Sequence, residues 1–224
     1  SCSASSDLIR SVHSVGNEIF SVSLELQGLL NLKGKFQIDE LTERYYALCM
    51  KYRSSPSLHL LWLNNIIDKL TTCECYLEAG ICEMQAVYYI YRVTKGNDIG
   101  YINVNHLALI CSDFLMDRKD TSEIPLDFTK DLLLKHAFNG IELFMKARMT
   151  WFGVEVCQML QEYFEKENNI EELGMIHEKI ADFFLDYANG TSVDIKYYLV
   201  EIGDSQYIYT STLDEDQFRE MFNQ

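Results

Sequence analysis

Three cysteines lie close together in the sequence, at Cys73, Cys75 and Cys82. Closely spaced thiolates are good ligands for Zn²⁺, but structural zinc sites usually combine two pairs of nearby ligands. No second pair and no histidine lies near these cysteines, so we predict no metal site. The chain has seven cysteines, and most lie in apolar helical stretches, which indicates buried, reduced thiols in a cytosolic protein.

The five histidines are scattered singly along the chain and do not form a recognisable catalytic pattern. They are His13, His59, His106, His136 and His177. His177 is followed by Glu178, but a helical zinc-protease motif needs a second histidine four residues after the first. We interpret these histidines as surface or hydrogen-bonded structural residues, although a site assembled in space stays open.

Sequence motifs that bind phosphates or activate a serine are also missing. The chain contains no GxxxxGK[ST], GxGxxG or GxSxG pattern. The acidic residues Glu171 and Glu172 lie at an expected helix start, where negative charge complements the helix dipole without any catalytic role. We therefore assign no catalytic or cofactor-binding residue and expect no cofactor and no enzymatic bond chemistry.

The overall charge narrows the classes of partner. The chain has 224 residues, 19 basic and 34 acidic side chains, and a formal net charge of −15. Such a surface repels nucleic acids and anionic lipids, and it suits either a basic patch on a protein partner or solubility alone. No apolar run reaches the ~20 residues of a membrane span, and the N-terminus lacks a signal-peptide pattern. We expect a cytoplasmic protein, with any recruitment to membranes left to regions outside this chain.

Helical periodicity covers most of the chain. Hydrophobic residues make up 48% of it and prolines number only two, so a large helical core is feasible. The apolar spacing predicts a series of helices. They span residues 7–32, 39–53, 56–70, 76–93, 104–116, 127–149, 154–167 and 170–187. The last two form an expected hairpin joined at Asn168 and Asn169, with Asn189 and Gly190 as the stop signal.

The character of the sequence changes near residue 190. Residues 195–202 and 207–211 are rich in β-branched and aromatic side chains and flank a glycine-containing turn, which predicts a β-hairpin. Residues 213–222 suggest a short acidic helix. We therefore expect a mainly α protein: an antiparallel array of helices over residues 1–190, then the incomplete start of a β-rich lobe over 191–224.

Several segments are similar, in order and spacing, to the DHR2 (DOCKER) module of DOCK-family exchange factors for Rho GTPases. The segments are SSPSLHLLWL at 54–63, YLEAGIC at 76–82, the hairpin at 154–184, IKYYLV at 195–200 and YIY at 207–209. The resemblance covers roughly residues 40 to 220 and is thin between 97 and 150. His59 stands where the family usually has arginine, and Glu172, Leu173 and Gly174 replace a family turn, which indicates a divergent member.

The resemblance implies a function as part of a guanine nucleotide exchange factor. In that family a helical lobe supports the module and dimerises, a β-rich lobe contacts the GTPase, and a third lobe expels the nucleotide. We expect this chain to contain the first lobe and the start of the second, and to lack the third. The implied partners are a Rac-like or Cdc42-like GTPase and a second copy of the chain. The alternative is a helical-repeat interaction scaffold without exchange activity, although no clear 34-residue repeat is present.

Two groups of residues are candidates for these contacts. Aromatic and methionine side chains suit the centre of an interface, and the candidate dimer residues are Met145, Met149, Trp151, Phe152, Val156 and Met159. Ordinary core packing is the favoured explanation, because a stripe at helical spacing usually faces its own domain. The resemblance places Tyr197, Tyr198, Tyr207 and Tyr209 in the lobe that faces the GTPase.

Overall fold

Residues 36–52, 55–94, 102–110, 125, 128–191, 196–202, 205–211, 216 and 219 are described by a computed structural model of the chain. The predicted helix at residues 7–32 lies outside these residues, and so does the predicted helix at 213–222 apart from Asp216 and Arg219.

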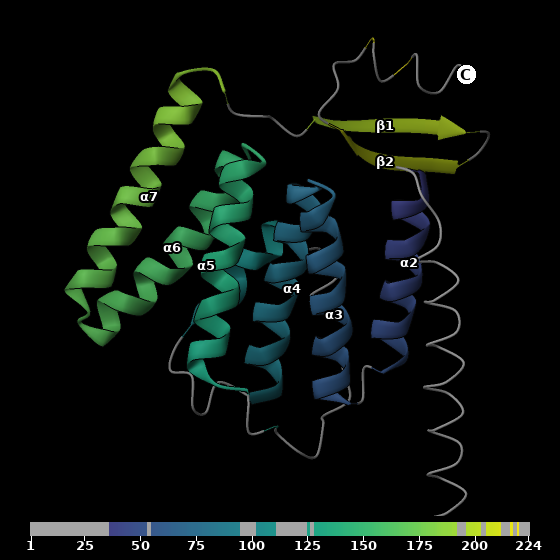
Figure 1. Cartoon of the computed structure of the whole chain (residues 1–224). Coiled ribbons are helices and arrows are strands. Elements are labelled where there is room, and N and C mark those ends of the chain that lie inside the picture. Colours follow the sequence, from purple (N-terminus) through teal and green to yellow (C-terminus); the bar gives the residue numbers. More distant parts are fainter. Residues whose placement is uncertain are drawn as a thin grey trace, which may run out of the picture.

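Six α-helices follow one another in the described part of the chain. They are α2 (Phe36–Lys51), α3 (Pro56–Thr72), α4 (Tyr76–Thr94), α5 (Lys130–Lys146), α6 (Thr150–Glu167) and α7 (Ile170–Ala188). Each helix packs against the next one in sequence, so the chain runs up and down in an array from α2 to α7 (Figure 1). This arrangement confirms the predicted array of helical hairpins.

The connection between α4 and α5 contains a short 3₁₀ helix, η1 (Val104–Leu109), which packs against α6 and α4. We predicted an α-helix over 104–116, and the structure corrects this for the described residues 104–109. Within them Asn103 accepts a hydrogen bond from the Asn105 amide, and the Ile110 amide donates to the Leu107 carbonyl three residues earlier. That spacing is typical of a tight 3₁₀ turn.

The helix ends explain why short turns suffice between neighbours. At the ends of α3, α5, α6 and α7 one residue adopts a left-handed conformation; these residues are Glu74, Arg148, Asn168 and Gly190. At each end the following amide donates to a carbonyl five residues earlier, as Cys75 does to Leu70 and Thr191 does to Asp186. This is the Schellman motif, which satisfies terminal carbonyls and reverses the chain.

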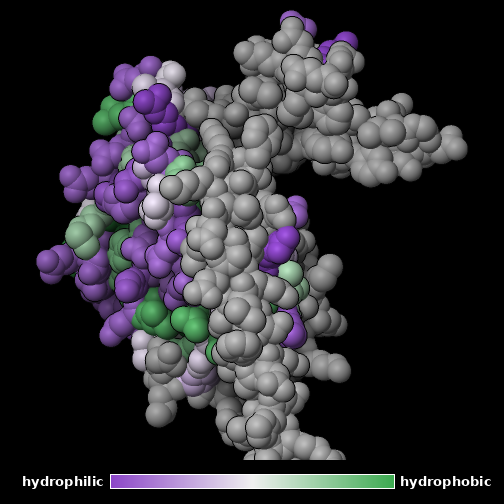
Figure 2. Space-filling view, turned by 45° about the vertical axis from the view of Figure 1, so that its right-hand side comes forward, coloured by the Kyte–Doolittle hydropathy of each residue, from purple (hydrophilic) through white to green (hydrophobic). Residues whose placement is uncertain are grey.

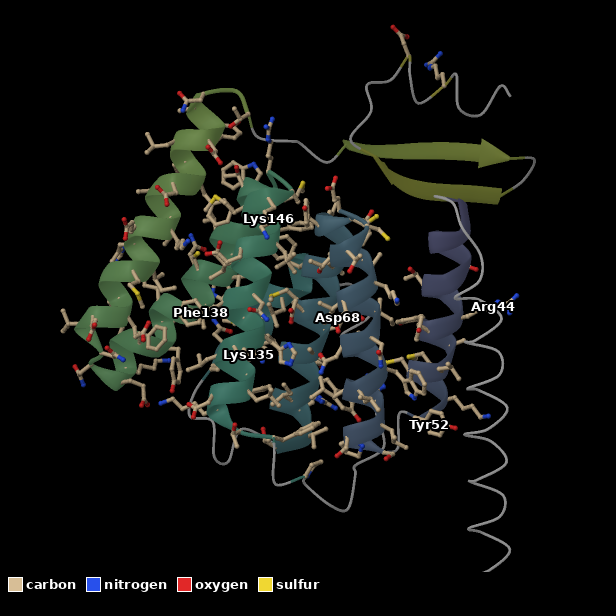
Figure 3. All side chains as sticks on the ribbon, in the orientation of Figure 1. Arg44, Tyr52, Asp68, Lys135, Phe138 and Lys146 are labelled. Carbon is tan, nitrogen blue, oxygen red and sulfur yellow. The ribbon has the colours of Figure 1, made fainter. Side chains whose placement is uncertain are left out.

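Side chains from every helix fill the spaces between helices (Figure 3). Between α4 and α5 two glycines act as notches: a Cβ at Gly80 would lie 2.7 Å from Phe144, and one at Gly140 would overlap Met84. Between α5 and α6 the Phe138 and Phe164 rings stack with centroids 6.3 Å apart (Figure 3). Because large side chains enter glycine notches from both helices, α4 and α5 pack closely.

An antiparallel strand pair follows the helices, formed by β1 (Lys196–Ile202) and β2 (Ser205–Ser211). The register places Tyr198 opposite Tyr209 and Val200 opposite Tyr207. Residues directly opposite each other, and those two apart on one strand, share a face of a hairpin. Positions 198, 207 and 209 therefore lie on one face and position 197 on the other.

Candidate functional site

The inner side of α7 is fixed against α6 by a third glycine notch. A Cβ at Gly153 on α6 would overlap the ring of Phe183, which is only 1% exposed. Next to it, the Thr150 hydroxyl donates to the Phe183 carbonyl at 3.4 Å. Lys179 also donates to Glu142 on α5 at 2.6 Å, and that hydrogen bond raises the pKa of Lys179. These contacts set the orientation of α7 and hence what it presents outwards.

Large apolar side chains lie exposed where the start of α6 meets the end of α7. Trp151 is 53% exposed, Phe184 45%, Leu185 60% and Tyr187 46%. The Trp151 ring lies edge-on to Phe184 and Tyr187, with centroids 6.4 and 5.7 Å apart. We call Trp151, Phe184 and Tyr187 the aromatic patch. Figure 2 shows one face of the described surface as mainly hydrophilic, with smaller hydrophobic areas. A contiguous exposed apolar cluster is typical of a protein-interaction surface.

The structure separates the six residues predicted to form a dimer face. Met149, Val156 and Met159 are buried, at 3%, 0% and 0% exposure, and contribute to the core. Met145 and Phe152 are partly buried against the same core. Trp151 alone among the six is more than half exposed, and it belongs to the aromatic patch. The first three therefore serve this chain's own packing.

Sequence reasoning missed Phe184, Leu185 and Tyr187 as surface residues. The apolar pattern of residues 170–187 predicts one helix of a hairpin without indicating which of its sides is exposed, and only Ile176 and Phe183 on α7 are buried. The useful signal was the breadth of the pattern. A helix that is apolar over more than one stripe has more apolar surface than a single neighbour can cover.

The predicted GTPase-facing residues Tyr197, Tyr198, Tyr207 and Tyr209 all lie in β1 and β2. The strand register places positions 198, 207 and 209 on one face and 197 on the other. The structure brings the first three together by position.

A polar cluster attaches η1 to α6. His106 Nδ1 lies 2.8 Å from Glu155 Oε2, and His106 Nε2 lies 3.2 Å from Glu162 Oε1. Asn103 also donates to Glu162, at 3.0 Å. Carboxylates only accept hydrogen bonds, so both contacts require the doubly protonated imidazolium form. Burial lowers the pKa of His106, but hydrogen bonds to Glu155 and Glu162 outweigh it and raise the pKa overall.

A second histidine–carboxylate pair is buried between α4 and α5. His136 Nδ1 lies 2.5 Å from Glu83 Oε2, and Asn139 donates to the other carboxylate oxygen at 3.2 Å. The Nε2 atom of His136 is buried and has no hydrogen-bond partner. The Glu83 carboxylate thus accepts hydrogen bonds from two side chains of α5, His136 and Asn139. This pair fixes the register of two helices and is closed to solvent.

The remaining polar groups also have structural roles. His59 is buried, its Nδ1–H donates to the Cys49 carbonyl at 2.7 Å, and its ring packs 4.1 Å from that of Tyr89. Burial raises the pKa of the Cys82 and Cys157 thiols to about 12. Both thiols therefore stay protonated, which makes them poor nucleophiles and poor metal ligands.

The described residues also lack a metal-binding cluster and a membrane-spanning helix. No group of three or more histidine, cysteine or acidic residues in this part of the chain is arranged to hold a metal ion. No helix among the same residues is long and apolar enough to cross a membrane. The features left for function are the aromatic patch, the outer side of α7 and the strand pair.

A comparison with protein families decides where this architecture belongs. The family model "DHR-2, Lobe A" matches residues 43–189, a span that contains α3 to α7 and most of α2. The chain belongs to the DHR-2 lobe A family. The predicted resemblance to the DOCK-family exchange module is thereby confirmed. His59, at the position where we expected arginine, is a buried structural residue of this lobe A.

Two curated relatives from the same family are similar in sequence to this chain. "Dedicator of cytokinesis protein 8" from Homo sapiens is 24% identical over 206 residues, which cover 82% of this chain and 9% of the relative. The protein of the same description from Mus musculus is 24% identical with the same coverage. The chain therefore spans about a tenth of the length of these relatives.

Proposed function

We propose that this chain acts within a guanine nucleotide exchange factor for Rho-family GTPases, as the helical lobe that supports the module and joins two copies. The observation that carries the proposal is the lobe A match at residues 43–189, because it coincides with one continuous helical array from α2 to α7. An array of this kind is rigid, and rigidity suits a lobe that holds other parts in position.

The strand pair supports the second element of the proposal. β1 and β2 follow the matched region directly, and two strands alone are marginal in water. We assign residues 1–190 to lobe A and 191–224 to the start of a β-rich lobe that contacts the GTPase. Tyr198, Tyr207 and Tyr209, which share one face of the pair by register, are the first positions to examine for that contact, with Tyr197 as the opposite-face comparison.

Exchange does not require the chain to break or form a covalent bond. An exchange factor binds the nucleotide-free GTPase more tightly than the loaded one and shifts the equilibrium by that difference in affinity. The protonated thiols of Cys82 and Cys157 and the enclosed Glu83–His136 pair agree with this role. The proposed role of lobe A is to hold the lobes that contact the GTPase in position.

A nucleotide-release assay tests the proposal. A fluorescent guanine nucleotide is loaded on a panel of Rac-like, Cdc42-like and other Rho-family GTPases. Release is measured with this chain and with a version extended at the C-terminus to include the further lobes. We expect the extended version to accelerate release and this chain alone to have little effect. A well-folded extended version that accelerates release from no member of the panel would overturn the proposal and leave the scaffold alternative.

A matched pair of variants connects the assay to lobe A. In the extended version, Gly153→Ala disturbs the α6–α7 contact, whereas Gln158→Ala changes an exposed residue of α6. If lobe A holds the GTPase-binding lobes in position, Gly153→Ala slows nucleotide release and Gln158→Ala does not. Equal activity of both variants would show that the packing of lobe A is irrelevant to exchange.

A further inference from the structure

The same dipeptide, asparagine followed by glycine, occurs at two places in the chain. One is Asn139–Gly140, inside α5, and the other is Asn189–Gly190, at the C-terminal end of α7. This dipeptide is chemically labile, because the backbone nitrogen of the glycine can attack the side-chain carbonyl carbon of the asparagine. Glycine has no Cβ to hinder that approach. The two sites therefore allow one reaction to be compared in two environments.

The reaction is a deamidation and consumes only water. The glycine nitrogen loses its proton and bonds to Cγ of the asparagine, the bond from Cγ to the side-chain nitrogen breaks, and ammonia leaves. The succinimide ring that results takes up one water molecule. Opening at one carbonyl gives aspartate, and opening at the other gives isoaspartate, in which the main chain runs through the former side chain. Both products carry a carboxylate that asparagine lacks.

The site inside α5 is protected by packing. Gly140 is buried, and a Cβ at this position would overlap Met84 of α4. The side-chain amide of Asn139 donates to Glu83 Oε1 at 3.2 Å, which holds this side chain towards α4. Ring closure requires the asparagine backbone to leave the helical conformation, and at this position that would part α5 from α4. Opening a packed helix at its centre approaches global unfolding in cost.

The site at the end of α7 has a different environment. Asn189 and Gly190 are both exposed, and a Cβ at Gly190 would meet nothing within 4 Å. Gly190 has a φ of +68°, so the chain leaves the helix directly after Asn189. Within the described part of the chain, no hydrogen bond to the Asn189 side chain is formed. Its side-chain carbonyl is therefore accessible to the neighbouring backbone nitrogen once the last turn opens.

Hydrogen bonds of the Schellman motif hold this last turn closed. The Gly190 amide donates to the Tyr187 carbonyl at 3.0 Å. The amide and the hydroxyl of Thr191 donate to the Asp186 carbonyl at 3.0 and 2.7 Å. Residues 187–190 are exposed, so water competes for these contacts. Helix ends fray, and such openings are far more frequent than openings at the centre of a packed helix.

We propose that Asn189 is a site of spontaneous deamidation, and that its conversion to isoaspartate loosens the junction between lobe A and the strand pair. α7 ends at Ala188 and β1 begins at Lys196. The last turn of α7 has no basic residue, so a new carboxylate there meets the negative end of the helix dipole without compensation in that turn. Isoaspartate also adds a methylene group to the main chain, which displaces the Gly190 and Thr191 amides from their carbonyl partners.

Incubation of the purified chain tests the site. Native protein and protein unfolded in guanidinium chloride are kept at body temperature in mildly alkaline buffer with a thiol reductant. Peptide mass spectrometry follows conversion at each asparagine, and methylation by an isoaspartyl-specific methyltransferase identifies isoaspartate. In denaturant we expect Asn139 and Asn189 to convert at similar rates. In the native chain we expect Asn189 to convert at least about a hundredfold faster than Asn139, because only the end of α7 opens readily.

Each outcome of this incubation decides the question. Preferential conversion of Asn189 in the native chain supports the proposal. Native protein in which Asn139 converts as fast as Asn189 overturns it, because packing would then not control the reaction. Native protein in which neither site converts, although both do in denaturant, also overturns it, because the Schellman motif would then protect Asn189.

Hydrogen exchange tests the loosening of the junction. The Gly190 and Thr191 amides are compared before and after incubation in wild type and in Asn189→Gln, whose longer side chain would have to close a larger ring and reacts far more slowly. In the converted wild type we expect both amides to exchange at least about tenfold faster, with no change in Asn189→Gln. The buried Gly140 amide is the internal reference. Unchanged exchange in converted wild type, or equal acceleration in both proteins, would contradict the loosening.

Discussion

The two sides of α7 have similar residues, a phenylalanine on each, but one side is buried and the other is exposed. On the inner side, Phe183 inserts into the notch at Gly153 and is 1% exposed. On the outer side, the adjacent Phe184 is 45% exposed and the notch at Gly174 is open. Hydrophobicity alone does not distinguish these sides. What distinguishes them is whether a neighbouring helix of the same chain supplies the complementary shape.

Because α7 has one packed side and one exposed side, lobe A can fold as a domain and, as proposed, also bind a second copy. Helices α3 to α6 bury their apolar sides against one another. Between α4 and α5, Phe144 packs at Gly80 and Met84 packs at Gly140, so neither glycine position has room for a Cβ atom. Among the described residues the array ends at α7, which has one face that they leave exposed. A helix at the end of an array either exposes polar residues or finds a partner.

The largest expected difference comes from truncating the two neighbouring phenylalanines. Phe183→Ala removes a fully buried ring and leaves a cavity beside Gly153, so we expect the free energy of unfolding to fall by about 3–5 kcal/mol. Phe184→Ala removes an exposed ring and should cost less than about 1 kcal/mol. Urea unfolding below micromolar concentration measures both values without a contribution from self-association.

Self-association should respond in the reverse order. Phe184→Ala removes an exposed ring of the aromatic patch and should weaken the proposed dimer while the monomer keeps its stability. If both variants lowered the free energy of unfolding by similar amounts, the contrast between the inner and outer sides of α7 would be wrong.

Adding one methyl group at each notch should change stability with opposite signs. Gly153→Ala overlaps the Phe183 ring, and overpacking of this kind costs about 1–3 kcal/mol. Gly174→Ala meets nothing within 4 Å, so the higher helix propensity of alanine should stabilise the monomer by up to about 1 kcal/mol. Thermal unfolding of the two variants under identical conditions tests the pair; a decrease for Gly174→Ala would show that its notch is already occupied within the chain.

The helices were predictable because their signals are local. Prediction placed α4 at residues 76–93 and the structure has Tyr76–Thr94. The turn at Asn168 and Asn169 was also correct, since asparagine tolerates the left-handed conformation seen at Asn168. The start of α6 was missed by four residues, from 154 to Thr150. Gly153 disfavours helix locally, and only its contact with Phe183 shows why glycine is needed there.

The candidate surface was harder to predict than the helices. Val156 and Met159 have apolar side chains of the kind found in interfaces, but both are fully buried within the chain. Burial depends on which helices become neighbours, and periodicity does not contain that information. Trp151 alone of the six candidates is largely exposed, in the first turn of α6 beside Phe184 and Tyr187 of α7. The polar contacts of His106 link residues 49 and 56 positions apart, so no local motif announces them.

The smallest expected effect concerns the stability of the contact between η1 and α6. The raised pKa of His106 means that its contacts with Glu155 and Glu162 stabilise the fold fully below the ordinary histidine pKa of about 6.5. This contribution is lost as pH rises through the folded-state pKa. Hydrogen bonds from Asn103 and His106 lower the pKa of Glu162, so its contribution is present above the ordinary glutamate pKa and is lost in stronger acid.

Replacing His106 by glutamine should therefore cost about 1 kcal/mol at pH 6, as expected for a partly exposed ion pair, and progressively less towards pH 8.5. The measurement is urea unfolding at several pH values for wild type, His106→Gln, Glu155→Gln and the double variant. In the double-mutant cycle the coupling between the two side chains should shrink as pH rises. A coupling that stays constant over this range would mean that His106 is held as a neutral hydrogen-bond donor.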